Sequence, residues 1–153
     1  MRDVYRSHQG DVLLLIVGTI ALGAAMEKTG VSQLYAEVFL AVFSGYSPSV
    51  ILGGMIVLTS ISSQILSNNA TAVLIFPIAV STALGLGVDP KPFIIGICFG
   101  ASACFATPFG YQTNLLVSGP GGYRFSDYLK LGVPLNILVL IAGTFFIPKI
   151  WPF

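Results

Sequence analysis

Charge is the property that this sequence has least of. Its 153 residues include only seven Lys or Arg and six Asp or Glu, 8% of the chain, whereas 55% of the residues are hydrophobic. Soluble domains carry roughly 25% charged residues, so this chain has too few to cover a surface exposed to water. The composition therefore predicts a membrane protein.

Clusters of basic residues are also missing. The formal net charge is +1, and the seven basic residues are scattered between Arg2 and Lys149. Binding to a phosphate backbone needs several Lys or Arg side chains together. We therefore expect no nucleic-acid partner.

Cysteine and histidine are too few for enzymatic chemistry or a transition-metal site. Cys98 and Cys104 lie six residues apart, which on a helix places them on different faces and too far apart for a disulfide. We interpret both as small buried side chains. His8 is the only histidine, and no metal-ligand spacing of Cys, His, Asp or Glu occurs in the sequence. We expect a protein that is not an enzyme and has no cofactor besides an ion.

The charged residues leave four uncharged runs, at residues 12–26, 38–88, 92–123 and 131–148. Crossing a bilayer takes about 20 apolar residues, so the last two runs are candidates and the first can cross with its flanks. The first run is also compatible with a signal peptide, because Arg2 and Arg6 precede it, but apolar segments then continue to the C-terminus. We expect an all-α, polytopic membrane protein.

The second run is too long for one span and has to reverse inside the membrane. From Thr59 to Thr71 it reads TSISSQILSNNAT, in which nine of thirteen residues are polar and none is charged. The apolar arm before this patch is short for a crossing. We therefore predict a re-entrant hairpin over 49–86 with its tip at 63–71, near mid-membrane. The alternative is an aqueous loop between two full spans, although such a loop usually carries charge.

The third run contains a second interruption. Residues 91–118 are long enough to cross, but Pro108 removes a backbone donor and clashes with the preceding turn. This predicts a broken transmembrane helix with its break over 106–110. Ahead of the break, Gly96 and Gly100 form a G-x-x-x-G pattern, which indicates close packing against another helix.

The remaining segments complete the expected order. We predict a transmembrane helix at 11–27, an interfacial arm helix at 30–45, a glycine-rich turn at 119–122 and a last transmembrane helix at 128–150.

Both interruptions carry uncharged polar groups that suit a hard cation. The side-chain oxygens of Ser63, Ser67, Asn68 and Thr107, with freed backbone carbonyls, can replace the hydration shell of Na⁺. A helix that starts near Ala70 would direct its N-terminal amides at the same place and favour an anionic group. A proton relay would need Asp, Glu or His, and these runs contain none. We therefore predict sodium coupling.

At these sites the sequence resembles a known family. SNNATAVLIFPIA looks like the Ser-Asn-Thr signature at the hairpin tip of the divalent anion:sodium symporters, which include citrate, dicarboxylate and sulfate permeases. ATPFGYQTNLLVSGPGGYRFSDYLKLGVPLN is similar to their broken helix and last span, and ALGAAMEKTG to the helix and arm before the hairpin. The resemblance implies the C-terminal part of a permease, an incomplete second inverted repeat that works by alternating access with an elevator-like movement.

The resemblance also implies roles for individual residues. The residues expected to contact substrate are Ser67, Asn68, Asn69, Thr107 and Pro108. The residues expected to bind sodium are Ser63, Leu66, Asn68 and Ala106. The chain departs from the family pattern at Asn69, where the signature has Thr, and at Gln64, where an acidic residue often precedes the motif.

The sequence thus predicts a sodium-coupled symporter of a small divalent anion. The partners expected are the anion, Na⁺, the lipid bilayer, the missing N-terminal repeat and a second copy in a homodimer, in the plasma or inner membrane of the cell. One alternative is a proton-coupled or uncoupled anion permease of the same superfamily, with coupling residues in the missing half. Another is a structural subunit or a fragment without transport of its own.

Overall fold

The computed structural model describes residues 17–153 except 19, 20, 23, 27, 44 and 109. The described residues form helices and no strand, which confirms the all-α prediction. In chain order the helices are α2 (Val31–Val42), α3 (Pro48–Ser63), α4 (Asn68–Leu86), α5 (Pro90–Ser102), α6 (Gln112–Gly121) and α7 (Phe125–Ile150). Most of the predicted span at 11–27, and His8, lie outside the described residues.

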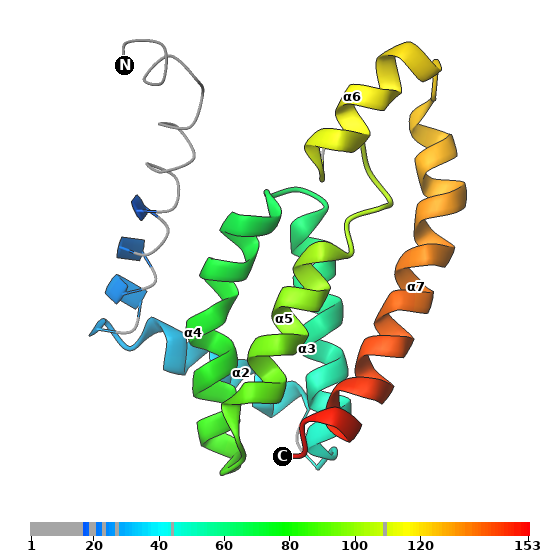
Figure 1. The fold of residues 1–153 in the computed structure, drawn as a ribbon. Helices are drawn as coiled ribbons and strands as arrows, with labels where there is room; N and C mark the ends of the chain where they lie inside the picture. Colours follow the sequence, from blue (N-terminus) through cyan, green and yellow to red (C-terminus); the bar gives the residue numbers. More distant parts are fainter. Residues whose placement is uncertain (1–16, 19–20, 23, 27, 44, 109) are drawn as a thin grey trace, which may run out of the picture.

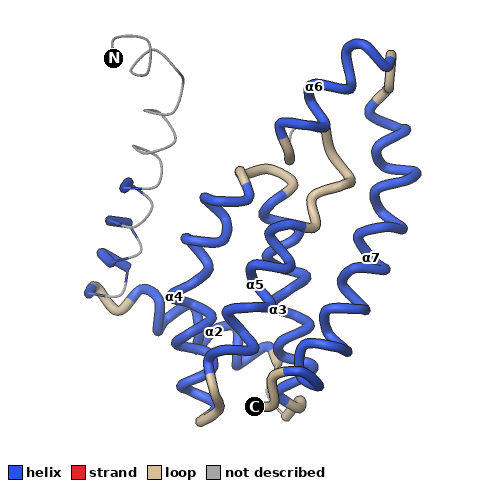
Figure 2. The backbone as a smooth tube through the Cα atoms, in the orientation of Figure 1, coloured by secondary structure: helices blue, strands red, loops and turns tan. Residues whose placement is uncertain are grey.

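Helices α3, α4 and α5 pack against one another, and α7 lies along α3 and α5. Helix α2 contacts α4 and crosses behind the lower part of α4 and α5 in Figure 1. The core between these helices is apolar, with Leu52, Met55, Ile56 and Phe93 fully buried. The turn after α3 and the segment between α5 and α6 lie beside each other in Figure 2, and the α5–α6 segment contacts the middle of α7, at Asn136, rather than its end.

The helices correspond to the predicted segments. Helix α2 lies inside the arm predicted at 30–45. Helices α3 and α4 cover the segment predicted at 49–86, and α3 begins one residue earlier, at Pro48. Helices α5 and α6 lie in the segment predicted at 91–118, and α6 ends three residues later, at Gly121. Helix α7 covers the span predicted at 128–150 and begins three residues earlier, at Phe125. Within the described chain, α4 and α7 are the two helices long and apolar enough to cross a membrane. The depth of the hairpin segment in a membrane stays a prediction.

The polar patch is more helical than the sequence suggested. Helix α3 continues through Thr59 to Ser63, because Thr59 Oγ1 and Ser62 Oγ donate to carbonyls one turn earlier, at 2.7 and 2.9 Å. Helix α4 then begins at Asn68, two residues before Ala70. The irregular backbone is thereby reduced to the short turn at 64–67.

The second interruption is wider than predicted. Helix α5 ends at Ser102, and residues 103–108, 110 and 111 are not helical, whereas the predicted break began only at 106. Pro108 explains why no helix continues through residues 104–107, because it cannot donate a backbone hydrogen bond, clashes with the carbonyl four residues earlier and biases Thr107 away from helical backbone. Helix α5 ends before that turn, at Ser102.

Two smaller predictions need correction. Residues 119–121 belong to α6 rather than to a turn, and the helix stops only at Gly122, whose φ of 61° is left-handed. Cys98 is exposed on α5 instead of buried, while Cys104 is buried; both thiols are free.

The G-x-x-x-G pattern marks a close approach, as predicted. A Cβ added to Gly96 would lie 2.6 Å from Leu52 Cδ1, and one added to Gly100 would lie 2.7 Å from the Ile56 carbonyl oxygen. Helix α5 therefore lies directly on α3 only because both positions lack a side chain. This contact fixes the register in which the ends of the two helices meet.

Candidate functional site

The end of α3 supplies hydrogen bonds to the end of α5. Because α5 stops at Ser102, its last carbonyls have no partner within the helix. Ser63 Oγ donates to the Ala101 carbonyl at 2.6 Å. Ser60 Oγ and Gln64 Nε2 both donate to the Ala103 carbonyl, at 2.7 and 3.0 Å. Three neutral side chains of α3 and its turn thus hold the carbonyls that the break exposes.

Asn68, the first residue of α4, joins this group. With its amide nitrogen turned inward, Asn68 donates to Ser63 Oγ at 2.8 Å, the Ala101 carbonyl at 3.1 Å and the Gly110 carbonyl at 3.2 Å. With its amide oxygen turned inward, the same position accepts from Ser63 Oγ at 2.8 Å. The amide therefore lies where α3, α4, α5 and the α5–α6 segment meet. We call Ser63 Oγ, the Asn68 amide and the carbonyls of Ala101 and Gly110 the oxygen cluster.

Thr107 ties the turn to the α5–α6 segment from the other side. Its Oγ1 donates to the backbone carbonyl of Gln64 at 2.9 Å and accepts from the Gly110 N–H at 3.2 Å. The hydroxyl thus fixes Gly110, whose carbonyl belongs to the oxygen cluster. A Cβ on Gly110 would lie 3.1 Å from Cys104 Cβ, so this part of the segment is tightly packed.

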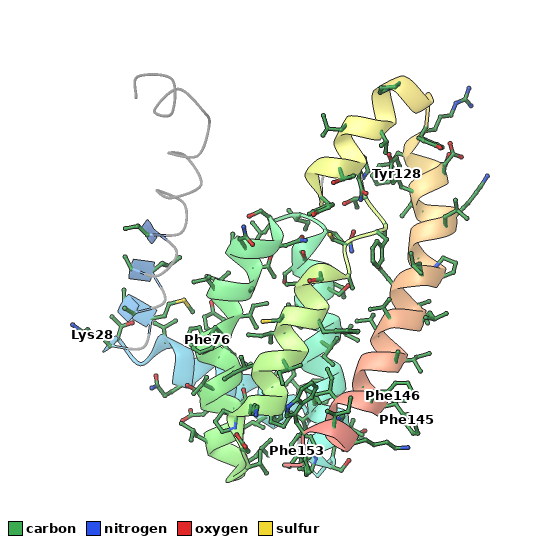
Figure 3. All side chains as sticks on the ribbon, viewed as in Figure 1. Lys28, Phe76, Tyr128, Phe145, Phe146 and Phe153 are labelled. Atoms are coloured by element: carbon green, nitrogen blue, oxygen red, sulfur yellow. The ribbon has the colours of Figure 1, made fainter. Side chains whose placement is uncertain are left out.

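Helices α6 and α7 hold the outer side of the break. Asn114 Nδ2 donates to the carbonyls of Cys104 and Thr107, at 3.2 and 3.1 Å. The Tyr128 hydroxyl, which lies between α6 and α7 in Figure 3, donates to the Asn114 carbonyl at 2.8 Å. The start of α7 thereby positions the residue that closes the break.

Further along α7, two residues contact the break directly. Asn136 is buried, and its Oδ1 accepts a hydrogen bond from the Phe105 N–H at 3.3 Å. A Cβ on Gly132 would lie 2.1 Å from the Phe105 carbonyl oxygen. The backbone at Phe105 therefore lies against α7 and depends on a glycine there.

The structure brings together only some of the predicted site residues. Ser63, Asn68 and Thr107 converge on the oxygen cluster, and Ala106 and Pro108 are buried in the adjoining break. The remaining three lie at the turn's outer side. The Ser67 hydroxyl caps α4 by accepting from the Ala70 N–H at 3.3 Å, and the side chains of Leu66 and Asn69 are exposed.

Sequence reasoning missed several residues that hold the site. Ser60 and Gln64 lay in the quoted polar patch without an assigned role, and Asn114 lay in the second motif. Asn136 and Gly132 were overlooked in the last predicted span. Asn136 did carry a signal, because a polar amide inside an apolar run requires a hydrogen-bond partner.

Comparison with known proteins identifies the family. The citrate transporter family matches residues 1–151. The chain is 41% identical over 151 residues, 99% of its length, to the uncharacterized transporter YfbS of Escherichia coli K12, and 43% identical over 141 residues, 92% of its length, to an uncharacterized transporter of Synechocystis. It spans about a quarter of the length of these relatives, 25% and 23%.

A further relative has a more specific name. The sodium/sulfate cotransporter 1 of Chlamydomonas reinhardtii is 34% identical over 135 residues, which cover 87% of this chain and 15% of that protein. The resemblance seen at the hairpin-tip motif is thus confirmed by matches over nearly the whole chain. The chain belongs to the citrate transporter family and is part of an integral membrane protein.

Proposed function

We propose that this chain belongs to a secondary active transporter that couples the uptake of a small divalent anion to Na⁺ by alternating access. The observation that carries the proposal is the oxygen cluster, in which two hydroxyl or amide side chains and two backbone carbonyls meet without any charged group. The name of the Chlamydomonas sodium/sulfate cotransporter supports both the ion and the class of anion.

The chemistry of the cluster favours a hard cation. With the Asn68 amide oxygen inward, Ser63 Oγ and the carbonyl oxygens of Ala101 and Gly110 lie 2.8, 3.1 and 3.2 Å from it, and oxygen ligands are what small hard cations prefer. Only the Ser63 hydroxyl brings a proton to this arrangement, so a cation has to offset the mutual repulsion of the oxygens. Turning the amide nitrogen inward replaces the cation by hydrogen bonds. The hydrogen bonds around Asn68 are satisfied with the amide nitrogen inward, so binding of Na⁺ here would require the amide to turn its oxygen inward.

The position of the cluster along α7 supports the re-entrant hairpin and the broken helix. Helix α7 has 26 residues, about 39 Å at a rise of about 1.5 Å per residue. Asn136, which contacts the break, lies about 17 Å from its first residue on the same rise. If α7 crosses the membrane, the cluster therefore lies near mid-membrane, where polar backbone is stable only inside protein or beside water.

The anion is proposed to bind beside the cluster, on the exposed side of the turn. Helix α4 directs its first backbone N–H groups toward this side, and a helix N-terminus favours anions. Ser67, Asn69, Thr107 and Pro108 are the proposed contacts. Bound Na⁺ would supply the positive charge that the uncharged site lacks, so each ligand strengthens the binding of the other.

The remaining elements of the proposal concern the whole carrier. The carbonyls of Leu66 and Ala106 are proposed as further sodium ligands, and an N-terminal repeat as the other half of the anion site. The carrier is proposed to be a homodimer in the plasma or inner membrane, with an elevator-like movement.

Transport by the full-length gene product in proteoliposomes tests this function. Uptake of labelled sulfate, citrate and a dicarboxylate is measured at fixed pH with external Na⁺ or with choline in its place. We expect uptake of at least one anion to require Na⁺, and Asn68→Ala to abolish that requirement together with most of the uptake. Uptake that is equal in choline, or that follows a pH gradient instead, would refute sodium coupling and favour a proton-coupled or uncoupled permease.

A further inference from the structure

Thr71 carries a buried hydroxyl with no partner. It lies in the first turn of α4, its side chain is 0% exposed, and no hydrogen-bond partner reaches its Oγ1. Buried polar groups are nearly always hydrogen-bonded, so an exception within the described residues calls for a ligand that protein atoms do not supply.

Comparable hydroxyls in the same bundle are satisfied. Thr59, Thr82 and Thr144 are all buried or half-buried helical threonines, and each donates to the carbonyl four residues earlier, at 2.7, 2.7 and 2.8 Å. This bond is the usual solution for a threonine inside a helix. Thr71 does not adopt it, so its hydroxyl is directed elsewhere.

The geometry of α4 directs Thr71 toward Asn68. The two residues are three apart, which places them on one face of the helix with their Cβ atoms about 5–6 Å from each other. Side chains in a helix lean toward its N-terminus, and for Thr71 this is the direction of Asn68 and the oxygen cluster. No hydrogen bond joins the two side chains, so each can contribute an oxygen to one small ion between them.

We propose that the Thr71 hydroxyl is a further ligand of the Na⁺ ion at Asn68, on the side of the ion that faces the bundle interior. This inference rests on the proposed function and adds to it a residue outside the Ser-Asn motif. The oxygen cluster contacts the ion from α3, α5, the α5–α6 segment and the first residue of α4, and Thr71 adds a contact one turn further along α4. A closed shell of neutral oxygens is the feature that discriminates a small ion from a larger one.

The test compares three variants of the full-length gene product. Thr71→Val removes the hydroxyl with little change of shape, and Thr71→Ser keeps it. Thr82→Val is the matched control, because Thr82 is equally buried on α4 and its hydroxyl is already satisfied by Ile78. Two readouts are used: the Na⁺ concentration for half-maximal anion uptake, and the rise of the thermal unfolding midpoint when NaCl replaces choline chloride.

We expect Thr71→Val to raise the half-saturating Na⁺ concentration by about tenfold and to reduce the Na⁺-dependent rise in unfolding temperature. Thr71→Ser and Thr82→Val should keep the wild-type values. A shift of the same size in Thr82→Val, or an unchanged Na⁺ response in Thr71→Val, overturns the inference. If Thr71→Val has an unchanged Na⁺ response but lower stability in choline, the Thr71 hydroxyl binds a structural water instead. If the unsubstituted protein responds to Na⁺ in neither readout, the proposed function itself fails.

Discussion

The two interruptions of the helices differ in what holds them. The turn between α3 and α4 is closed mainly by its own residues: the N–H groups of Ile65 and Leu66 donate to the Ser62 carbonyl, and Ser67 caps α4. The segment between α5 and α6 instead takes its partners from distant helices, including Ser60 on α3 and Asn136 on α7.

This difference indicates which parts of the site are encoded locally. The turn needs only four consecutive residues, the last of which is the capping Ser67, so it can form as soon as α3 and α4 pair. The break has carbonyls that stay in place only while α3 and α7 are packed against it. Substitutions on α3 or α7, far from the break in sequence, should therefore disturb the break strongly. Substitutions within the turn should disturb the turn less.

The largest effect is expected at Gly132. Gly132→Ala adds a Cβ that would lie 2.1 Å from the Phe105 carbonyl oxygen, a backbone atom that cannot move alone. We expect a loss of about 3 kcal/mol in the free energy of unfolding and a weakened Na⁺ response. Gly119→Ala is the control, because nothing lies within 4 Å of its added Cβ. Wild-type stability of Gly132→Ala would show that the break does not rest on α7.

Asn136→Leu comes next. The substitution keeps the branched shape of the side chain but leaves the half-buried Phe105 N–H without an acceptor. Such an orphaned donor costs about 2 kcal/mol, measured as a lower unfolding midpoint in detergent. Because the change alters the backbone of the break, half-saturation by Na⁺ should also move upward. A change in stability without any change in Na⁺ response would show that the contact of α7 with Phe105 does not affect Na⁺ binding.

Tyr128→Phe should have a smaller effect. It removes one half-buried hydrogen bond to the Asn114 carbonyl and leaves the ring in place. We expect a loss of about 1 kcal/mol and a Na⁺ response close to wild type. Tyr123→Phe is the matched control, since its ring packs edge-on against Tyr128 and is itself exposed. Equal effects of both variants would mean that the hydroxyl bond does not support the break.

Ser67→Ala should have the smallest effect on the fold. It removes the long, exposed cap bond to the Ala70 N–H, and such bonds contribute about 0.5 kcal/mol at the low end of their range. If Ser67 contacts the anion as proposed, the half-saturating anion concentration should nevertheless rise, while the Na⁺ response of unfolding stays unchanged. Uptake with wild-type affinity for every tested anion would remove Ser67 from the substrate contacts.

The elements of the fold followed from local patterns in the sequence. Uncharged apolar runs predicted the helices, Pro108 predicted the break, and the uncharged polar patch predicted the turn. Boundaries were less accurate, because hydroxyl side chains can be satisfied inside a helix, as at Thr59, and because a proline disturbs the turn before it.

The pairings within the site could not be predicted from one sequence. That Ser60 and Gln64 reach the Ala103 carbonyl depends on the register of α5 on α3, which is set by the contacts of Gly96 and Gly100. The same holds for α7, whose contact residues are distant in sequence from the break. Asn68 was identifiable because it lies in the SNNAT motif, and Ser63 was identifiable through the family resemblance at that motif.

The contacts of α7 with the rest of the site fall on one stripe. Tyr128, Gly132 and Asn136 follow one another at intervals of four residues, while Phe145 and Phe146 point away from the bundle in Figure 3. In a carrier that moves its binding site across the membrane, α7 has to travel with that site, since Phe105 would otherwise lose its amide partner. If the carrier moves as proposed, the boundary between its moving and stationary parts would lie outside α7, along the side that carries the exposed Phe145 and Phe146.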